Sequence, residues 1–154
     1  MDIYEKLSQK GINIGVGPKP KGLYHPTLLT KDRLLYTSGT GPRKNEEPLY
    51  VGKVGDDVTM EEAKECAQLC IINILGHVQN ELGDLNRVER VVKVLGFVAS
   101  SDNFYGQTQV MNAASELLYD IFGENGIGTR SAIGVRCLPQ NMPVEIEAVF
   151  QIRQ

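Results

Sequence analysis

Toward its C-terminal end the chain runs Arg130-Ser131-Ala132-Ile133-Gly134-Val135-Arg136-Cys137-Leu138-Pro139 and then, after four intervening residues, Val144-Glu145-Ile146-Glu147-Ala148-Val149-Phe150. Both stretches read as strands, and a proline-containing connection joins them. One arginine, Arg130, stands at the start of the first strand. It can be a solvated strand-end residue, because arginine is mostly exposed. It can also be a clamp, because its planar guanidinium binds a carboxylate through two parallel hydrogen bonds.

Length and composition limit the kind of molecule. The 154 residues fit one domain, 1–154, that is long enough to bury roughly 68–70% of its unfolded surface. The net charge of −3 and the absence of a Lys/Arg run argue against a nucleic-acid partner. No apolar stretch approaches the roughly 18 residues of a membrane span, and no secretory signal pattern is present. Three cysteines, an odd number, argue against a disulfide framework and favour a reducing cytoplasm.

The N-terminal part of the chain is expected to be irregular before a sheet begins. Residues 1–22 form an N-terminal segment in which Asp2 to Gln9 can be a short helix. From Gly15 to Gly22 closely spaced glycines and prolines disfavour regular structure, since proline lacks the donor that a sheet requires. Two short strands are expected at Tyr24–Thr30 and Arg33–Thr37.

The clearest single element is a long helix in the middle of the chain. It follows a polar excursion, Gly41–Val58, which can cover a site or point away from it and which contains a possible short strand at Leu49–Val51. Thr59 and Glu62 have the spacing of a capping box, and Gly83 suits the left-handed position after the last turn. Apolar residues then recur at steps of three and four: Ala63, Ala67, Cys70, Ile71, Ile74, Val78 and Leu82.

The second half of the chain supplies a central strand and another helix. Val88–Ala99 has apolar residues on both sides, which is typical of a covered central strand. A helix from about Phe104 to Phe122 can be capped by Ser101 or Asp102. Strands and helices alternate too irregularly for a doubly wound parallel sheet. We therefore predict an α+β fold, a mixed sheet with two helices on one face.

The C-terminal pattern R-S-A-x-x-V-x-x-L-P-x-x-x-x-V-E-I-E-A resembles the signature of the RidA family, also called YjgF, YER057c and UK114. Fifteen positions separate Arg130 from Glu145, as in that family. The resemblance extends from about Gly22 to Ile152, and the Pro-rich segment before Tyr24 resembles a longer branch of the family. It implies a chorismate-mutase-like fold and a homotrimer whose sheets form a closed, barrel-like core.

The resemblance also assigns candidate site residues one by one. The family's tyrosine of the first strand corresponds to Tyr24, and its Ser-Gly pair corresponds to Ser38-Gly39. Its helix asparagine resembles Asn112, and its arginine and glutamate resemble Arg130 and Glu145. These assignments imply a substrate-binding set completed by two catalytic residues, the arginine and the glutamate.

Two positions depart from the family pattern. Ala132 stands where many members have cysteine, two residues after the arginine. Its backbone N–H can still serve a substrate carboxylate, but a role for the thiol is lost. Gly128-Thr129 stands where Pro-x is common, which can change the shape of the loop before Arg130.

The reaction implied by the resemblance is hydrolysis of an amino-acid-derived enamine or imine, such as 2-aminoacrylate or 2-iminopropionate, to a 2-keto acid and ammonia. Arg130 would hold the substrate carboxylate, and Glu145 would position the water. Ser38 would hydrogen-bond near the substrate, and Tyr24 would wall the pocket. No metal or organic cofactor is needed, because the substrate is already reactive, and the partners expected are small imine or enamine carboxylates.

The spacing of the two catalytic candidates raises a geometric problem. If the last two strands form a hairpin, Glu145 lies opposite about Arg136, and Arg130 is roughly 20 Å farther along at about 3.3 Å per residue. One small substrate cannot bridge that distance. Either the site is completed across a subunit interface, with Arg130 from one chain and Glu145 from the next, or another strand lies between the two and changes the register.

Several other reactive side chains have simpler interpretations. Cys66 and Cys70 lie one helical turn apart but lack a matched histidine pair, so buried thiols are expected. Cys137 is interpreted as a core thiol within a strand. His77 is expected to be a packing or surface residue. Glu147 shares a face with Glu145 and can support it or be solvated.

The sequence is also compatible with two functions other than an enamine/imine deaminase. The same cleft can belong to a non-catalytic module that binds small carboxylates, since a clamp binds whether or not it catalyses. Endoribonuclease activity is the other rival, and the acidic balance argues against it because phosphate contacts need positive charge.

Overall fold

The structure is a computed structural model and describes residues 2–154, so Met1 at the start of the expected N-terminal segment lies outside it. Three helices and seven strands make up these residues, with short 3-10 turns between some of them. In chain order they are α1 (Ile3–Gln9), β1 (Thr27–Leu29), β2 (Leu34–Thr37), β3 (Arg43–Lys44), β4 (Glu47–Pro48), α2 (Met60–Leu82), β5 (Val88–Ala99), α3 (Gln107–Phe122), β6 (Thr129–Val135) and β7 (Val144–Ile152).

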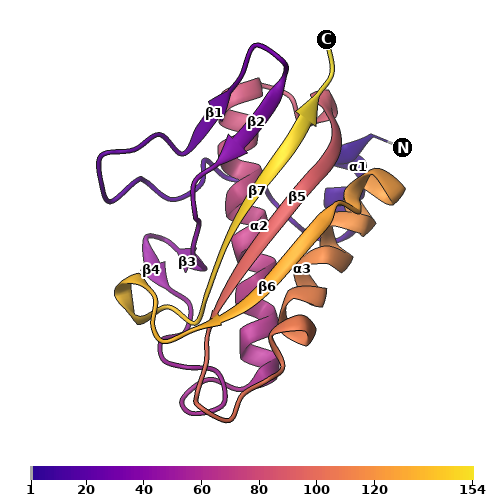
Figure 1. Ribbon diagram of the computed structural model, residues 1–154. Helices are drawn as coiled ribbons and strands as arrows, with labels where there is room; N and C mark the ends of the chain where they lie inside the picture. Colours follow the sequence, from indigo (N-terminus) through magenta and orange to yellow (C-terminus); the bar gives the residue numbers. More distant parts are fainter. Residues whose placement is uncertain (1) are drawn as a thin grey trace.

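The main sheet has five strands in the order β1-β2-β7-β5-β6. Neighbouring strands in this sheet are antiparallel, except for β5 and β6, which are parallel and are connected through α3. Helices α2 and α3 pack on one face of the sheet, and the other face is left open in the protomer (Figure 1). The prediction of an α+β fold with a mixed sheet and two helices on one face is confirmed, and α1 is a third, short helix.

Helix α2 forms as its sequence predicts. The Thr59 hydroxyl accepts a hydrogen bond from the Glu62 backbone N–H at 3.1 Å, and the Glu62 carboxylate accepts one from the Thr59 N–H at 3.1 Å. Gly83 ends the helix in the left-handed region, at φ 78°. The apolar stripe is buried beneath the sheet. Within residues 2–154, no helix combines the length and the apolar character needed to cross a membrane.

The expected hairpin of the last two strands is not formed. Strand β5 lies between β6 and β7 and pairs with both, so the segment after β6 crosses the end of β5 to reach β7. A strand, β5, is therefore inserted between the two, as one of the two alternatives supposed, and the register that it sets determines how far apart Arg130 and Glu145 lie. Parallel strands need a crossover, and α3 supplies it between β5 and β6.

Helix α3 begins later than predicted. Its N-cap is Gly106, without a side-chain cap, so neither Ser101 nor Asp102 caps it. The helix lies close to the sheet because Gly96, in the middle of β5, has no side chain: a Cβ there would overlap the Met111 thioether.

Three smaller expectations also need correction. Strand β1 is shorter than predicted, and Tyr24 lies in the irregular segment before it. The short strand of the excursion is Glu47–Pro48, which pairs with β3, and Leu49–Val51 is not a strand. Cys137 is exposed and lies beyond the end of β6, whereas Cys66 and Cys70 are buried free thiols as expected.

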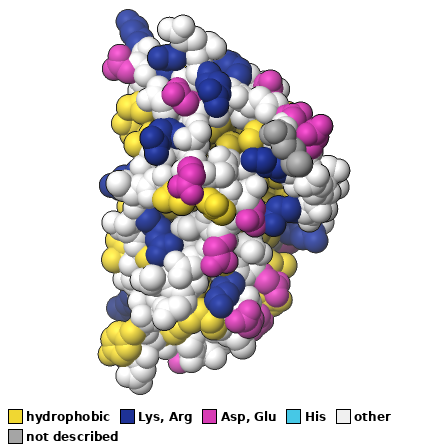
Figure 2. Space-filling model, turned by 90° about the vertical axis from the view of Figure 1, so that its right-hand side faces the viewer, with side chains coloured by type: hydrophobic (Ala, Val, Ile, Leu, Met, Phe, Trp, Pro, Cys, Tyr) yellow, Lys and Arg dark blue, Asp and Glu magenta, His cyan; other side chains and the backbone are white. Residues whose placement is uncertain are grey.

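The two faces of the protomer differ in surface chemistry. Figure 2 shows the side of α1 and α3, where basic and acidic side chains are interspersed and neither sign forms a broad patch. The open face of the sheet is more apolar. Leu28, Tyr36 and Ile133 are 58%, 45% and 45% exposed there, on three different strands.

The N-terminal segment is held against α2 by a close backbone approach. A Cβ on Gly76 would lie 2.7 Å from the Gly17 backbone nitrogen, so only glycine fits at this contact. The imidazole of His77 lies beneath Gly17 and is 8% exposed. Burial, and then the nearby charge of Arg43, lower the pKa of His77 below its usual value, whereas Glu46 acts in the opposite direction.

The lowered His77 pKa predicts a loss of stability in mild acid. The unfolded chain takes up a proton on this residue near pH 6.5, whereas the folded chain resists it, so stability is lost as the pH falls through that value toward the lower folded pKa. We expect the unfolding temperature to fall less between pH 7 and pH 5 in His77→Gln than in the wild type, measured by circular dichroism. His25→Gln, which changes the other, exposed histidine, should follow the wild type. Equal slopes for all three proteins would contradict the prediction.

Candidate active site

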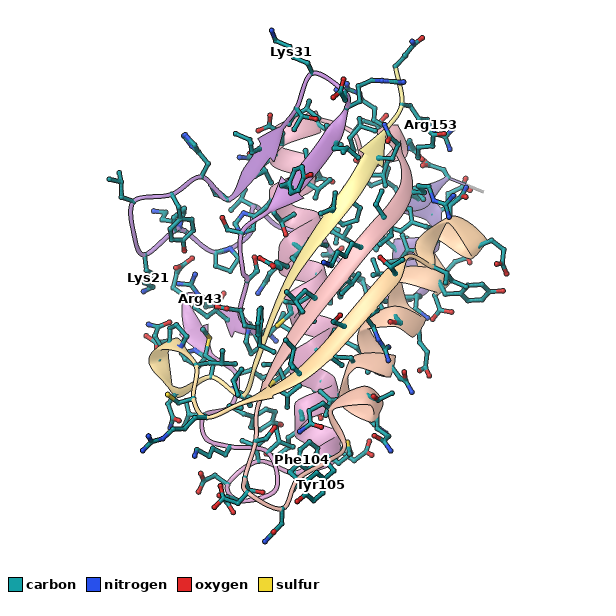
Figure 3. All side chains as sticks on the ribbon, in the orientation of Figure 1. Lys21, Lys31, Arg43, Phe104, Tyr105 and Arg153 are labelled. Carbon is teal, nitrogen blue, oxygen red and sulfur yellow. The ribbon has the colours of Figure 1, made fainter. Side chains whose placement is uncertain are left out.

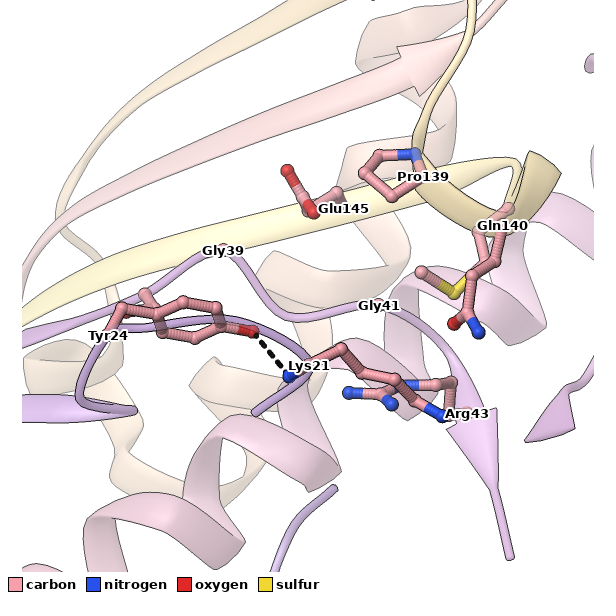
Figure 4. Close-up of a pocket in the computed structure, with 10 residues that line it drawn as sticks. Lys21, Tyr24, Gly39, Gly41, Arg43, Pro139, Gln140 and Glu145 are labelled. Atoms are coloured by element: carbon pink, nitrogen blue, oxygen red, sulfur yellow. Dashed lines mark hydrogen bonds between the residues drawn. The ribbon is translucent and has the colours of Figure 1, made fainter. Parts of the chain in front are cut away.

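One cavity gathers four of the residues assigned from the sequence. It has a volume of about 360 Å³ and lies between the loop before β1, the end of β2 and the start of β7. Tyr24, Ser38, Gly39 and Glu145 all line it, as the close-up in Figure 4 shows for the three that it labels. The volume lies within the range of small-molecule sites.

Glu145 is the acidic group of this cavity. Its carboxyl group packs directly on Gly39, where a Cβ would come within 2.9 Å of Cδ and Oε2, so glycine is required there for the carboxylate to occupy this place. Burial, and then the charge of Glu147, raise the pKa of Glu145 above its usual value. A raised carboxyl pKa moves the group toward the pH at which it can exchange protons efficiently.

The two hydroxyl groups of the cavity have defined hydrogen-bonding roles. The Ser38 hydroxyl donates to the His25 carbonyl oxygen at 2.6 Å, so its oxygen is left free to accept. The Tyr24 hydroxyl accepts from the Lys21 backbone N–H at 3.4 Å, and its own proton is left free to donate. The two hydroxyls of the cavity therefore offer one acceptor and one donor.

Arg130, Asn112 and Ala132 lie elsewhere, between the edge strand β6 and helix α3. The Nη1 atom of Arg130 donates to the Asn112 side-chain oxygen and to the Ser115 hydroxyl, each at 3.0 Å. These two bonds fix the guanidinium on a half-buried site at the edge of the sheet. In the chain from residue 2 onward, Arg130 forms no ion pair.

One protomer does not bring Arg130 and Glu145 together. Arg130 is in register with Val94 of β5, and Glu145 is in register with Phe97, so the two Cα atoms are separated by two strand spacings and three residues, roughly 14 Å. The side chains also point to opposite faces. Arg130 bonds to α3, whereas strand alternation turns Glu145 away from the helices.

Six further residues line the cavity and were not singled out by the sequence. Among them Arg43 and Lys21 are basic, and Gln140 is polar. Pro139 belongs to the Leu-Pro of the C-terminal motif but was assigned no role, and the other five lie in loops, in a short turn or, for Arg43, on the two-residue strand β3, so their burial depends on distant parts of the chain. The six are Lys21, Gly41, Arg43, Pro139, Gln140 and Met142.

Metal-ligating side chains do not gather in the described structure. No group of three or more His, Cys, Asp or Glu side chains among residues 2–154 is arranged to hold a metal ion. The cavity is lined by a carboxyl group of raised pKa, two hydroxyls and two basic side chains.

Fold and cavity together define a class of protein: α+β domains of the RidA type, with a carboxylate at the start of the last strand. A model of the family described as endoribonuclease L-PSP matches residues 15–152. The chain belongs to this family, which is the RidA (YjgF/YER057c/UK114) family whose motif the C-terminal strands resemble.

Individual relatives match over nearly the whole length. The protein TCP17 of Trypanosoma cruzi is 34% identical over 147 residues, which cover 95% of this chain and 91% of TCP17. The crystal structure of Atu1372 from Agrobacterium tumefaciens has a TM-score of 0.90 at 38% identity and covers 97% of this chain and 92% of its own. A candidate endoribonuclease from Shewanella oneidensis superposes with a TM-score of 0.94 at 23% identity, over 99% and 100% of the two chains, and this likeness shows the fold alone.

Proposed function

We propose that this protein hydrolyses reactive enamines and imines derived from amino acids, such as 2-aminoacrylate and 2-iminopropionate, to 2-keto acids and ammonia. The observation that carries the proposal is the division of the motif residues into two complementary halves. One half is a cavity with a carboxyl group of raised pKa, Glu145, and the other is a fixed guanidinium, Arg130, without an ion-pair partner in the described chain.

The proposed reaction needs only these groups. The imine C2 carries a carboxylate, which the Arg130 guanidinium binds with paired hydrogen bonds. Glu145 accepts a proton from water as the water oxygen bonds to C2, and the electron pair of the C=N double bond moves to the nitrogen, which takes the proton from Glu145. Glu145 then carries the proton of the new C2 hydroxyl to the nitrogen, the C–N bond breaks, C2 becomes a carbonyl carbon and ammonia leaves. Binding and orientation suffice, because the imine is already electrophilic.

We propose that the two halves meet at the interfaces of a homotrimer. Strand β6 is an edge strand whose outer side is unpaired in the protomer, and edges of this kind are usually covered. The open face of the sheet exposes Leu28, Tyr36 and Ile133, which favours association. In this arrangement Arg130 of one subunit faces the Glu145 cavity of the next.

The direct test generates 2-iminopropionate in place, with a dehydratase acting on serine, and follows keto-acid release. We expect the release to be faster with the protein than with the dehydratase alone. Glu145→Gln should abolish the acceleration while pyruvate, a small carboxylate, still binds in calorimetry. No acceleration by a folded oligomer, with this imine or with larger ones, would contradict the deaminase.

The second candidate is a carboxylate-binding module without catalysis, and the failed assay with retained pyruvate binding would establish it. Endoribonuclease activity has less support, because the net charge is −3 and the helix side has no broad basic patch. The three free thiols favour a reducing compartment, and we propose the cytoplasm.

A further inference from the structure

The cavity that contains Glu145 has a second charged group that the deaminase chemistry does not use. Arg43, on β3, lines the same cavity and is only 9% exposed. Arginine is rarely buried without partners, because an unpaired buried charge costs several kcal/mol. The hydrogen bonds of its guanidinium group therefore indicate whether the residue is purely structural.

The guanidinium of Arg43 is only partly satisfied by the described residues. Its Nη2 atom donates to the Lys19 carbonyl oxygen at 3.1 Å. Its Nη1 atom lies 3.5 Å from Oε2 of Glu46, an ion pair without hydrogen-bond geometry. Nε and Nη1 thus have no hydrogen-bond acceptor among residues 2–154. Two buried donors on a cation form an incomplete site for an anion.

The backbone around Arg43 is held in place by a side chain of helix α2. The Asn73 side-chain amide, on α2, donates to the Gly41 carbonyl at 3.0 Å and to the Arg43 carbonyl at 2.9 Å. These bonds hold the backbone at Arg43, and the bond from Nη2 to the Lys19 carbonyl holds the guanidinium, so less ordering is needed when a ligand binds, which lowers the cost of binding.

The part of the cavity near Arg43 has an excess of positive charge among its lining residues. Lys21 also lines it, and Lys21 and Arg43 lie on the same side of the molecule, in the region of the loop before β1 and strand β3 (Figure 3). Among the described lining residues Glu145 is the one carboxylate, and it lies on β7, above the two basic residues in the close-up view and across the Gly39–Gly41 segment from them (Figure 4). A cavity of about 360 Å³ also has room for more than a three-carbon imine, since one water occupies about 30 Å³ in the liquid.

We propose that Arg43, assisted by Lys21, binds a second anionic group at the far end of the substrate, so that the preferred substrates are imines of acidic amino acids. This inference rests on the proposed function, in which Arg130 of the neighbouring subunit takes the carboxylate next to the imine. The acidic group can be a carboxylate or a phosphate, since a guanidinium pairs with either.

The test compares two imines of similar size that differ in charge. Amino-acid oxidases, with catalase present, convert glutamate and leucine to their imines, and the rate of hydrolysis is measured for each. The wild type is expected to favour the glutamate-derived imine in kcat/KM. Arg43→Gln should lower the ratio of acidic to neutral rates about tenfold or more, the effect of losing one hydrogen bond to a charged group. Lys21→Gln should lower the ratio less.

Two matched variants separate recognition from folding. Lys44→Gln removes the neighbouring, exposed cation of β3, which does not line the cavity, and should leave the ratio unchanged. Glu46→Gln removes the carboxylate nearest to Arg43 and should raise the ratio, because the guanidinium is then free for the ligand. If Arg43→Gln does not fold, Lys21→Gln and Glu46→Gln still decide the question.

The outcomes distinguish this inference from the proposed function. Equal rates on both imines, or an unchanged ratio in the variants, would overturn the second anion site and leave the deaminase standing. Hydrolysis of neither imine, together with no acceleration on 2-iminopropionate, would overturn the deaminase, and binding would then decide whether the anion site exists. Calorimetry with 2-oxoglutarate, inorganic phosphate and 4-methyl-2-oxopentanoate should show binding of the dianion or phosphate that weakens in Arg43→Gln, and equal affinities would overturn the site.

Discussion

Replacing Arg130 with alanine is expected to lower kcat/KM on 2-iminopropionate at least about 100-fold, the scale seen when one fixed charge-stabilising donor is removed from an active site. The guanidinium would no longer bind the substrate carboxylate, and the remaining donors cannot replace its paired geometry. Arg130→Lys should recover only part of the loss, because an ammonium is a point charge without the planar fork. The measurement is keto-acid release in the dehydratase-coupled assay.

A nearby arginine outside the candidate site serves as the control for this prediction. Arg136 is exposed and lies just beyond the end of β6, so Arg136→Ala should retain wild-type activity. Both alanine variants should unfold within a few degrees of the wild type, since half-buried or exposed arginines away from core contacts contribute little to stability. Full activity in Arg130→Ala would remove the clamp from the mechanism.

Mixing two inactive variants, Arg130→Ala and Glu145→Gln, is expected to restore about a quarter of wild-type activity when the subunits assemble at random in equal amounts. Each interface site needs an intact arginine from one chain and an intact glutamate from the next, and each is present with a probability of about one half. The fraction is the same for any closed ring of subunits. Coexpression in equal amounts provides the oligomers, two different tags verify that both chains are present, and the coupled assay measures the activity of the unselected population.

A site within one chain gives a different result in the same experiment. Every subunit then lacks one of the two residues, and no mixture regains activity. The matched control mixes Arg130→Ala with the double variant Arg130→Ala/Glu145→Gln, in which no intact arginine is present and no recovery is expected. Mixed oligomers that remain inactive would place both catalytic groups outside a shared interface.

Local signals in the sequence predicted the helices better than the pairing of strands. The capping box at Thr59 and Glu62 and the glycine at position 83 act within a few residues, so the bounds of α2 followed from them. The place of β6 relative to β7 in the sheet did not follow from any local signal. Strand β5 inserts between them from about forty residues earlier in the chain, and the period of a strand says nothing about its partner.

The candidate site was predictable only where a motif exists. Tyr24, Ser38, Gly39 and Glu145 carry the family resemblance and line one cavity. Arg43 lies in a polar excursion that reads as a surface loop, and its burial depends on contacts with distant segments. Contacts between distant segments produce no motif or hydrophobic repeat from which they could be predicted.

The hydrogen bond from the Ser38 hydroxyl to the His25 carbonyl has a consequence for the end of the proposed reaction. Its proton is committed, so the oxygen can receive a proton-bearing group but cannot offer one. An imine nitrogen, which carries N–H, satisfies this oxygen, whereas the ketone oxygen of the product has no proton and repels it. The Ser38 hydroxyl oxygen would thus favour binding of the imine and disfavour binding of the keto acid, which would help product release after ammonia has left.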